Sequence, residues 1–161
     1  QKVILMKLFC DGSVHPQSKI GYGAYLLVLN ATTNLSVLKT AVKTKQFSET
    51  SSTKLELETL LWALSQLPPL QESITIYTDS QNILSLLNRR ERLEGNNFIT
   101  KKGKLIANHL LYKEFYQRID NLNCEIIKLK GHPLEEEKDE IDRIFELVDQ
   151  APREALRNYL A

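Results

Sequence analysis

The chain has 161 residues, of which 42% are hydrophobic and 25% are charged, as in an ordinary globular domain that buries a core without disulfides. The formal net charge is only +1, so overall charge gives no argument for a nucleic-acid or membrane partner, and local charge must decide. There is no run of about 18 apolar residues and no signal pattern at the amino terminus, so we expect one cytoplasmic domain over residues 1–161 with no membrane partner.

The first third of the chain alternates between strand-like runs and turns. Lys2–Cys10 is apolar on both alternating faces, which predicts a central strand covered on both sides. Asp11–Gly23 is rich in turn residues and is predicted to be a loop. Tyr22–Leu29 and Leu35–Phe47 are predicted to be two further strands, joined by a polar hairpin turn at Asn30–Asn34.

Helical spacing then takes over from strand spacing. Leucines recur at helical intervals from Leu57 to Leu67, and Pro68-Pro69 is predicted to end that helix. Ile74–Thr78 is a short β-rich run that predicts a fourth strand. A second helix is predicted to begin in the run Ile83–Leu87.

The remainder of the chain completes an α/β pattern. Arg89–Lys104 is a polar stretch with six basic and two acidic residues, followed by a predicted third helix at Leu105–Leu122. Glu125–Lys130 alternates as a fifth strand, and Leu134–Asp142 is an acidic loop or helix start before a carboxyl-terminal amphipathic helix. The order βββαβααβα indicates one α/β domain with three antiparallel strands, then parallel ones, and helices on both faces.

Three acidic residues stand at positions that could form one site. Asp11 follows the first predicted strand, Asp79 follows the fourth, and Glu56 begins the first long helix. Ligands of open α/β sheets bind at the carboxyl ends of strands, so we expect these carboxylates to converge there. Carboxylates packed together repel one another, and divalent cations such as Mg²⁺ reverse that repulsion. Two such ions about 4 Å apart can promote phosphodiester hydrolysis. Taken singly, each acid is better explained as a turn or cap residue, whereas three acids at converging positions favour a shared site.

Six short motifs follow one another along the chain in an order that identifies a family. They are Asp11-Gly12-Ser13 with Gly21-Tyr22-Gly23-Ala24; Glu56-Leu57 with Ala63-Leu64; Thr78-Asp79-Ser80-Gln81; Asn108 with Leu111-Tyr112; Lys130-Gly131-His132; and Val148-Asp149 with Arg153-Glu154-Ala155. In this order, over nearly the whole chain, the motifs resemble those of the type 1 ribonuclease H family.

The resemblance implies a fold, an activity and a set of site residues. The implied fold is the ribonuclease H-like α/β fold, a five-stranded mixed sheet with helices on both faces. The implied activity is endonucleolytic hydrolysis of the RNA strand of an RNA–DNA hybrid to 5′-phosphate and 3′-hydroxyl products. The family's four metal-ligating carboxylates correspond to Asp11, Glu56, Asp79 and Asp149, which implies two Mg²⁺ ions, for which Mn²⁺ can substitute. The family's mobile histidine corresponds to His132, a residue type suited to moving protons near pH 7.

The resemblance also implies positions that contact the hybrid. A turn before the first long helix departs from the family pattern, because hydroxyls replace the usual amides there; a plain helix cap explains that turn as well as substrate contact does. The implied substrate-binding residues are Gly12, Ser13, Ser51, Ser52, Thr53, Gln81 and Asn108. Many members carry a basic, tryptophan-rich protrusion; here Arg89–Lys104 keeps a net positive charge but has no tryptophan, which predicts a weak, salt-sensitive hold on phosphate.

The identity of the fourth carboxylate is open between two residues. About ten residues separate the histidine from the last aspartate in much of the family, which would select Asp142, whereas Asp149 is seventeen residues after His132. The surrounding motif favours Asp149. Pro152 suits the first turn of a helix, so we expect a kink or a restart there that places Asp149 at a break.

Other functions remain open at this stage. A domain that binds nucleic acid without cleaving it, and an exonuclease or resolvase on the same fold, are the alternatives, because fold alone does not fix function. The chain begins at Gln1 rather than Met, which is compatible with a module of a larger polymerase-type protein. We expect a monomer.

Overall fold

The computed structural model describes residues 5–29, 34–68 and 73–161. In these residues the secondary-structure elements are, in chain order, β1 (Met6–His15), β2 (Ile20–Leu29), α1 (Leu35–Ala41), β3 (Lys43–Phe47), α2 (Ser52–Ser65), β4 (Ile74–Thr78), α3 (Gln81–Gly95), α4 (His109–Asp120), β5 (Cys124–Lys128), the short 3₁₀ helix η1 (Glu135–Glu137) and α5 (Glu140–Leu160).

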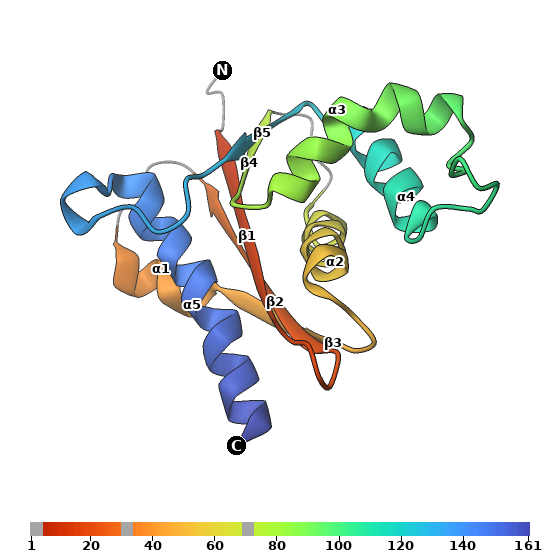
Figure 1. Cartoon of the computed structure of the whole chain (residues 1–161). Helices are drawn as coiled ribbons and strands as arrows, with labels where there is room; N and C mark the ends of the chain where they lie inside the picture. The colour runs from red at the N-terminus through yellow and green to blue at the C-terminus, as the bar shows by residue number, and fades with distance from the viewer. Residues whose placement is uncertain (1–4, 30–33, 69–72) are drawn as a thin grey trace.

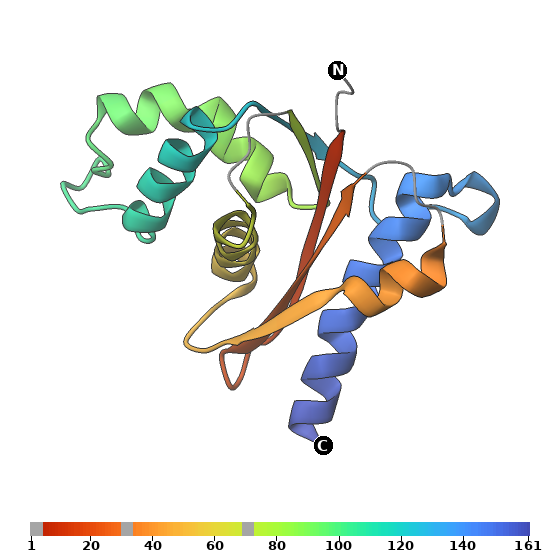
Figure 2. The ribbon, with the colours of Figure 1, turned by 180° about the vertical axis from the view of Figure 1, so that it is seen from behind.

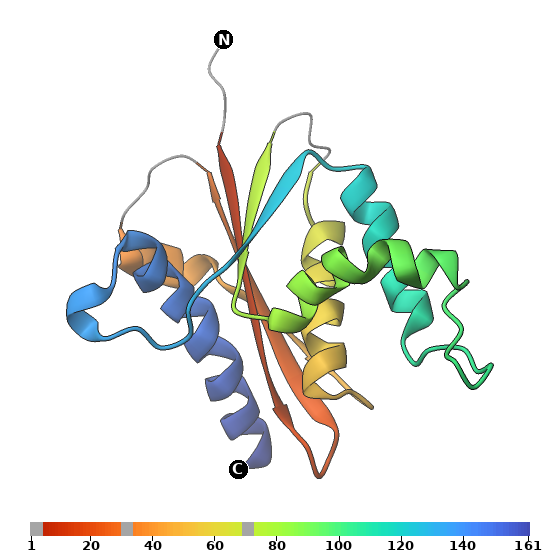
Figure 3. The ribbon, with the colours of Figure 1, turned by 45° about the horizontal axis from the view of Figure 1, so that its top comes forward.

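The strands form a five-stranded mixed sheet in the order β3-β2-β1-β4-β5. β1, β2 and β3 pair antiparallel, whereas β4 and β5 pair parallel to β1 and to each other. The helices α1 and α5 cover one face of the sheet, and α2, α3 and α4 lie on the other (Figures 1 and 3). The predicted five-stranded mixed sheet with helices on both faces is therefore confirmed.

Side chains of β1 point alternately into two hydrophobic cores, one on each face of the sheet. Leu8 and Cys10 point into the core on the α2 side, whereas Phe9 points into the core beneath α5. The ring of Phe9 stacks on that of Tyr77 from β4, with ring centroids 4.8 Å apart. Because side chains alternate, Asp11 lies on the same face of β1 as Phe9 and faces α5.

The predicted loop Asp11–Gly23 is wrong, because most of it is a β-hairpin. β1 continues to His15, β2 begins at Ile20, and the turn between them is short (Figure 2). The backbone groups of these polar residues form hydrogen bonds between β1 and β2. A polar composition was therefore compatible with a strand here. Gly23 lets α2 pack close to the hairpin: a Cβ there would come within 2.1 Å of Thr59 Oγ1.

The predicted strand Leu35–Phe47 is wrong over its first half. Leu35–Ala41 forms α1, and only Lys43–Phe47 is a strand. Asn34 begins the helix, since its side-chain oxygen accepts hydrogen bonds from the amides of Ser36 and Val37. Leu38 anchors α1 in the α5-side core. The hairpin turn predicted at Asn30–Asn34 falls mainly on residues 30–33, outside the described residues.

Helix boundaries around the basic stretch also differ from the prediction. α3 runs to Gly95, so the first part of the predicted polar stretch Arg89–Lys104 is helical, and α4 begins at His109 rather than Leu105. Arg90 ties the two helices together by two hydrogen bonds of 2.6 Å to the carboxylate of Asp120. Within the described residues, no helix is both long and apolar enough to cross a membrane.

Candidate active site

The register of the two central parallel strands brings Asp11 and Asp79 together. Phe9 of β1 lies opposite Tyr77 of β4. Asp11 and Asp79 each follow two residues later, so both lie on the face that α5 covers. Asp11 is not at the end of β1, as the sequence had predicted, but within it, because the strand continues to His15. Asp149 comes from α5 above them, and the carboxyl groups of Asp11 and Asp149 share a hydrogen bond.

These three acids form a cluster in which full ionisation is unfavourable. Burial, and then the charge of Asp79 and the hydrogen bond to Asp149, raise the pKa of Asp11 to about 9, although a hydrogen bond from the Gly12 amide opposes this. Burial and the charge of Asp149 also raise the pKa of Asp79, while nearby His132 acts in the opposite direction. The cluster therefore has more negative charge than its protein surroundings neutralise.

Glu56 approaches the cluster from the other side, on the first turns of α2. It is half-buried, and Ser80 Oγ donates a hydrogen bond of 2.5 Å to Glu56 Oε2. Ser80 is itself fixed, because its hydroxyl oxygen accepts a hydrogen bond from the amide of Ile83 as the N-cap of α3. Burial raises the pKa of Glu56, as does the charge of Asp79, and the Ser80 hydrogen bond lowers it. Glu56 is thus held beside Asp79.

Ser80 is a residue of the site that was not predicted from the sequence. The motif Thr78-Asp79-Ser80-Gln81 contains it and could have indicated it, but its hydrogen-bond partner Glu56 is 24 residues away in the chain. Ser80 is almost completely buried. Its hydroxyl therefore acts on the carboxylate of Glu56 from inside the fold.

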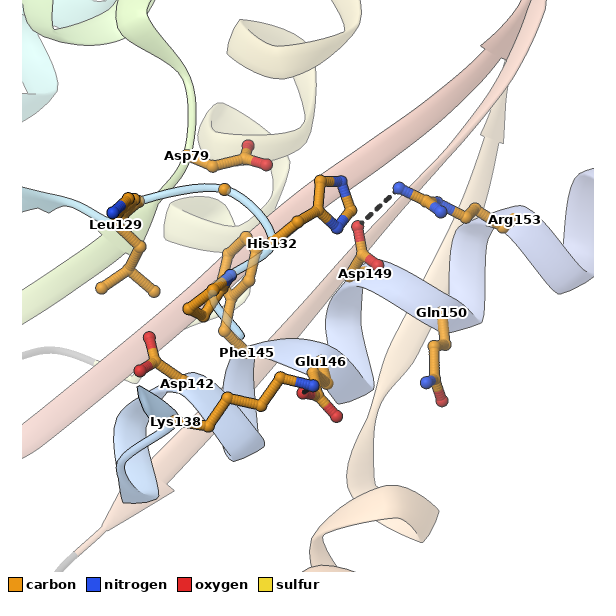
Figure 4. Close-up of a pocket in the computed structure, with 13 residues that line it drawn as sticks. Asp79, Leu129, His132, Lys138, Asp142, Phe145, Glu146, Asp149, Gln150 and Arg153 are labelled. Atoms are coloured by element: carbon orange, nitrogen blue, oxygen red, sulfur yellow. Dashed lines mark hydrogen bonds and ion pairs between the residues drawn. The ribbon is translucent and has the colours of Figure 1, made fainter. Parts of the chain in front are cut away.

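The positions of Asp142 and Asp149 distinguish the two candidates for the fourth acid. Asp142 lies in the first turn of α5 and forms a capping box with Asp139, whose amide donates to Asp142 Oδ2 at 3.1 Å. Asp149 lies two turns further on, where its Oδ1 accepts a hydrogen bond of 3.1 Å from Arg153 Nη2 (Figure 4). Asp149, not Asp142, contacts Asp11. The position thus favours Asp149, and its role as a ligand stays a prediction.

Of the kink or restart expected at Pro152, the restart is wrong, since α5 is one helix from Glu140 to Leu160 with Pro152 inside it. Pro152 is buried, and its neighbours Val148 and Ala151 on the same helix contribute to the α5-side core. Apolar packing therefore holds the helix together across the position where proline removes a backbone donor. Asp149 reaches the cluster from a regular helix.

His132 lies in the segment that follows β5. Its backbone has a φ of 51°, in the left-handed region that β-carbon sterics disfavour. The side chain lines a pocket of about 340 Å³ between this segment and α5, into which Asp79, Asp149 and Arg153 also project. Figure 4 shows the imidazole ring pointing toward the side of the pocket where Asp149 and Arg153 meet.

The donor set suits a hard divalent cation. The four carboxylates offer oxygen ligands, which Mg²⁺ and Mn²⁺ prefer, and the unneutralised charge around Asp11 would be relieved by a cation. Among the described residues, however, no three His, Cys, Asp or Glu side chains already have the arrangement of a metal centre. The carboxylates would have to turn toward one another to coordinate a common ion.

The predicted substrate-binding residues come from β1 and from the starts of α2, α3 and α4. Gly12 and Ser13 are in β1, Gln81 begins α3, and Asn108 precedes α4 with a φ of 66° and no side-chain cap hydrogen bond. Before α2, the helix-cap explanation is confirmed for one residue, since Ser51 Oγ accepts from the amide of Lys54 at 3.2 Å. Two residues beside it are exposed in the first turn of α2, namely Ser52 and Thr53.

Comparison with known proteins agrees with the motifs. The RNase H family model matches residues 4–149. The chain is similar to a solved structure described as the foamy viral protease-reverse transcriptase in complex with dsDNA, with a TM-score of 0.63 and 11% sequence identity, covering 93% of this chain and 94% of that chain. At that identity, the likeness shows the fold alone. No curated protein matches the sequence.

Proposed function

The chain belongs to the RNase H family, and we propose that it is a divalent-metal-dependent endonuclease that hydrolyses the RNA strand of RNA–DNA hybrids to 5′-phosphate and 3′-hydroxyl products. The observation that carries this proposal is the cluster of acids formed by Asp11 and Asp79 on the sheet and Asp149 on α5, with Glu56 beside it. A half-buried group of acids whose charges are not neutralised is costly to a fold, and such groups gather at functional sites.

In this proposal Asp11, Glu56, Asp79 and Asp149 hold two Mg²⁺ ions. When bound, the ions supply positive charge that polarises the phosphodiester and lowers the pKa of the attacking water. The protein fixes its acids from several elements: β1 and β4 set Asp11 and Asp79 side by side, Ser80 orients Glu56, and Arg153 holds one oxygen of Asp149. His132, beside Asp79, would accept or release protons and help product leave.

Recognition of the hybrid would come from the residues around the cluster. Exposed hydroxyl and amide side chains on Ser52, Thr53 and Gln81 can bond to sugar and phosphate oxygens of the RNA strand, whose 2′-hydroxyls distinguish it from DNA. The turn between α3 and α4 carries three exposed lysines: Lys101, Lys102 and Lys104. This turn would provide the weak phosphate contact that the sequence suggested, so binding should weaken steeply with salt.

Cleavage of end-labelled substrates tests the proposal. Purified protein with Mg²⁺ is incubated with an RNA–DNA hybrid, duplex DNA, duplex RNA and single strands of one sequence, with a chelator as the metal-free control. Internal cuts in the RNA of the hybrid, with 5′-phosphate ends, are the expected result. Binding of the hybrid without cleavage would indicate an inactive binding domain, and digestion of DNA from its ends or at branched junctions would indicate an exonuclease or a resolvase.

A further inference from the structure

The segment between His132 and Asp149 is longer than the usual spacing of the family. The seventeen-residue separation adds about two helical turns of chain, which the structure places in η1 and the start of α5. We name residues 133–139 the strap, because this segment leads directly away from His132 and folds back against α5. Its contacts show whether it is a passive insertion.

Ion pairs fasten the strap to α5. Lys138 Nζ pairs with Glu146 of α5 and also with Glu135 Oε2 at 2.9 Å. Glu135 in turn accepts a hydrogen bond of 2.9 Å from Arg143 Nη1, one helical turn into α5. The side chain of Lys138 is only 18% exposed, which is low for a lysine. Both charged ends of the strap are therefore tied to the same helix.

The pair between Lys138 and Glu146 differs from an ordinary surface pair. Glu146 Oε1, the oxygen that Lys138 contacts, is shielded from solvent. The two side chains are 18% and 35% exposed, so water and salt screen this pair less than a fully exposed pair. Other charged groups packed nearby are Glu135, Arg143 and Asp142.

The ion pair between Lys138 and Glu146 is adjacent to the candidate active site, both in space and along the chain. Glu146 precedes Asp149 by three residues on α5, so the two side chains lie one turn apart on one face. Lys138, Glu146, His132 and Asp149 line the same pocket (Figure 4). His132 has a left-handed backbone, which costs free energy in a non-glycine residue. The strap follows His132 directly along the chain, so its position affects where that backbone lies.

We propose that Lys138 is a positioning residue: its ion pair with Glu146 holds the strap on α5 and so fixes the place of His132 over Asp79 and Asp149. The effect on turnover rests on the function proposed above. The effect on the backbone of the strap does not, and it can be measured in protein without metal or substrate.

Amide hydrogen exchange tests the structural step. The variant Lys138→Met keeps the length of the side chain and removes its charge. Exchange should become about tenfold faster or more at the amides of Glu137 and Arg143, which donate hydrogen bonds to the carbonyls of Leu134 and Asp139 in the strap, because the ion pair no longer opposes local opening there. Lys138→Arg should restore slow exchange. As a control, Lys113→Met removes a lysine of α4 that lies over the ring of Phe98, and it should leave the exchange rates of these amides unchanged.

A double-mutant cycle tests the functional step. Alone, Lys138→Met should lower kcat about three- to tenfold with little change in KM, since the strap does not lie among the predicted hybrid contacts. In a His132→Ala background, Lys138→Met should have no further effect, because a residue that acts through His132 cannot act without it. If Lys138→Met does not fold, Glu146→Gln removes the same ion pair.

Two outcomes overturn the inference: wild-type exchange at Glu137 and Arg143 in Lys138→Met, or kinetic effects of the two substitutions that simply multiply. If the wild-type chain cleaves no hybrid at all, the proposed function fails, and the exchange data still decide whether Lys138 holds the strap.

Discussion

Replacing Asp11 with Asn should stabilise the metal-free protein. The pKa of Asp11 rises from 3.8 to about 9 in the folded chain, through burial first and the neighbouring acids second. Between these two pH values the folded protein keeps a proton that the unfolded chain releases. The folded state then binds more protons than the unfolded state, so rising pH favours unfolding. Asn has nearly the volume of Asp and no charge, so the variant escapes this penalty.

The size of the effect follows from the interval between the two pKa values. Each pH unit within it contributes about 1.4 kcal/mol against folding, so the penalty at pH 7 is about 4 kcal/mol at most. An amide replaces the shared hydrogen bond with Asp149 less well, which takes back about 1–2 kcal/mol. We therefore expect Asp11→Asn to raise the free energy of unfolding by about 2–3 kcal/mol at pH 7.

Urea denaturation at pH 5 and pH 8, in the presence of a chelator, measures this difference. The gap in unfolding free energy between variant and wild type should widen by up to about 4 kcal/mol between the two pH values. Saturating Mg²⁺ should then stabilise the wild type by about 2.7 kcal/mol at one hundred times its dissociation constant, and the variant by less. The exposed control Glu125→Gln should show no such widening. An equal gap at both pH values would refute the reasoning.

The remaining predictions concern cleavage of a labelled hybrid in Mg²⁺. Asp79→Asn should lower turnover at least about a hundredfold while circular dichroism shows an intact fold; wild-type turnover would remove Asp79 from the site. Asp149→Asn should lose most activity and Asp142→Asn little, and the reverse ranking would show that the ten-residue family spacing was the better guide. Ser80→Ala should lower activity or Mg²⁺ affinity about 10- to 100-fold by freeing Glu56, with Ser80→Thr as the control that keeps the hydroxyl; unchanged Mg²⁺ titration in Ser80→Ala would contradict this role.

The strongly patterned parts of the fold were predictable from sequence. The Ile74–Thr78 strand and the leucine-rich helix α2 appear where apolar periodicity placed them, and so does the predicted central strand from Met6 to Cys10, its residues 2–4 lying outside the described residues. Periodicity works there because each segment buries one face or both against a neighbour. The convergence of Asp11 and Asp79 followed from the same pattern, since two parallel strands with buried faces have little freedom in register.

The parts that were missed depend on partners that a local pattern does not contain. Leu35–Ala41 is too short for periodicity to distinguish a helix from a strand, and its helix is decided by the Asn34 cap and the burial of Leu38. The strand after Asp11 is stabilised by pairing with β2, which its polar composition does not reveal. Pro152 remains helical because its surroundings are apolar and packed.

A single strand pattern sets both the core and the chemistry. A slip of β1 by one residue would send Phe9 to the α2 side and carry Asp11 into an apolar core, so the burial of Phe9 against Tyr77 fixes where Asp11 stands. Carboxylates held by strand register are placed more precisely than loop residues would be. The same burial opposes their ionisation, so the divalent cations proposed above would let all of them be charged at neutral pH. Metal dependence of cleavage and metal dependence of stability should therefore have a common origin, and a substitution that abolishes one should weaken the other.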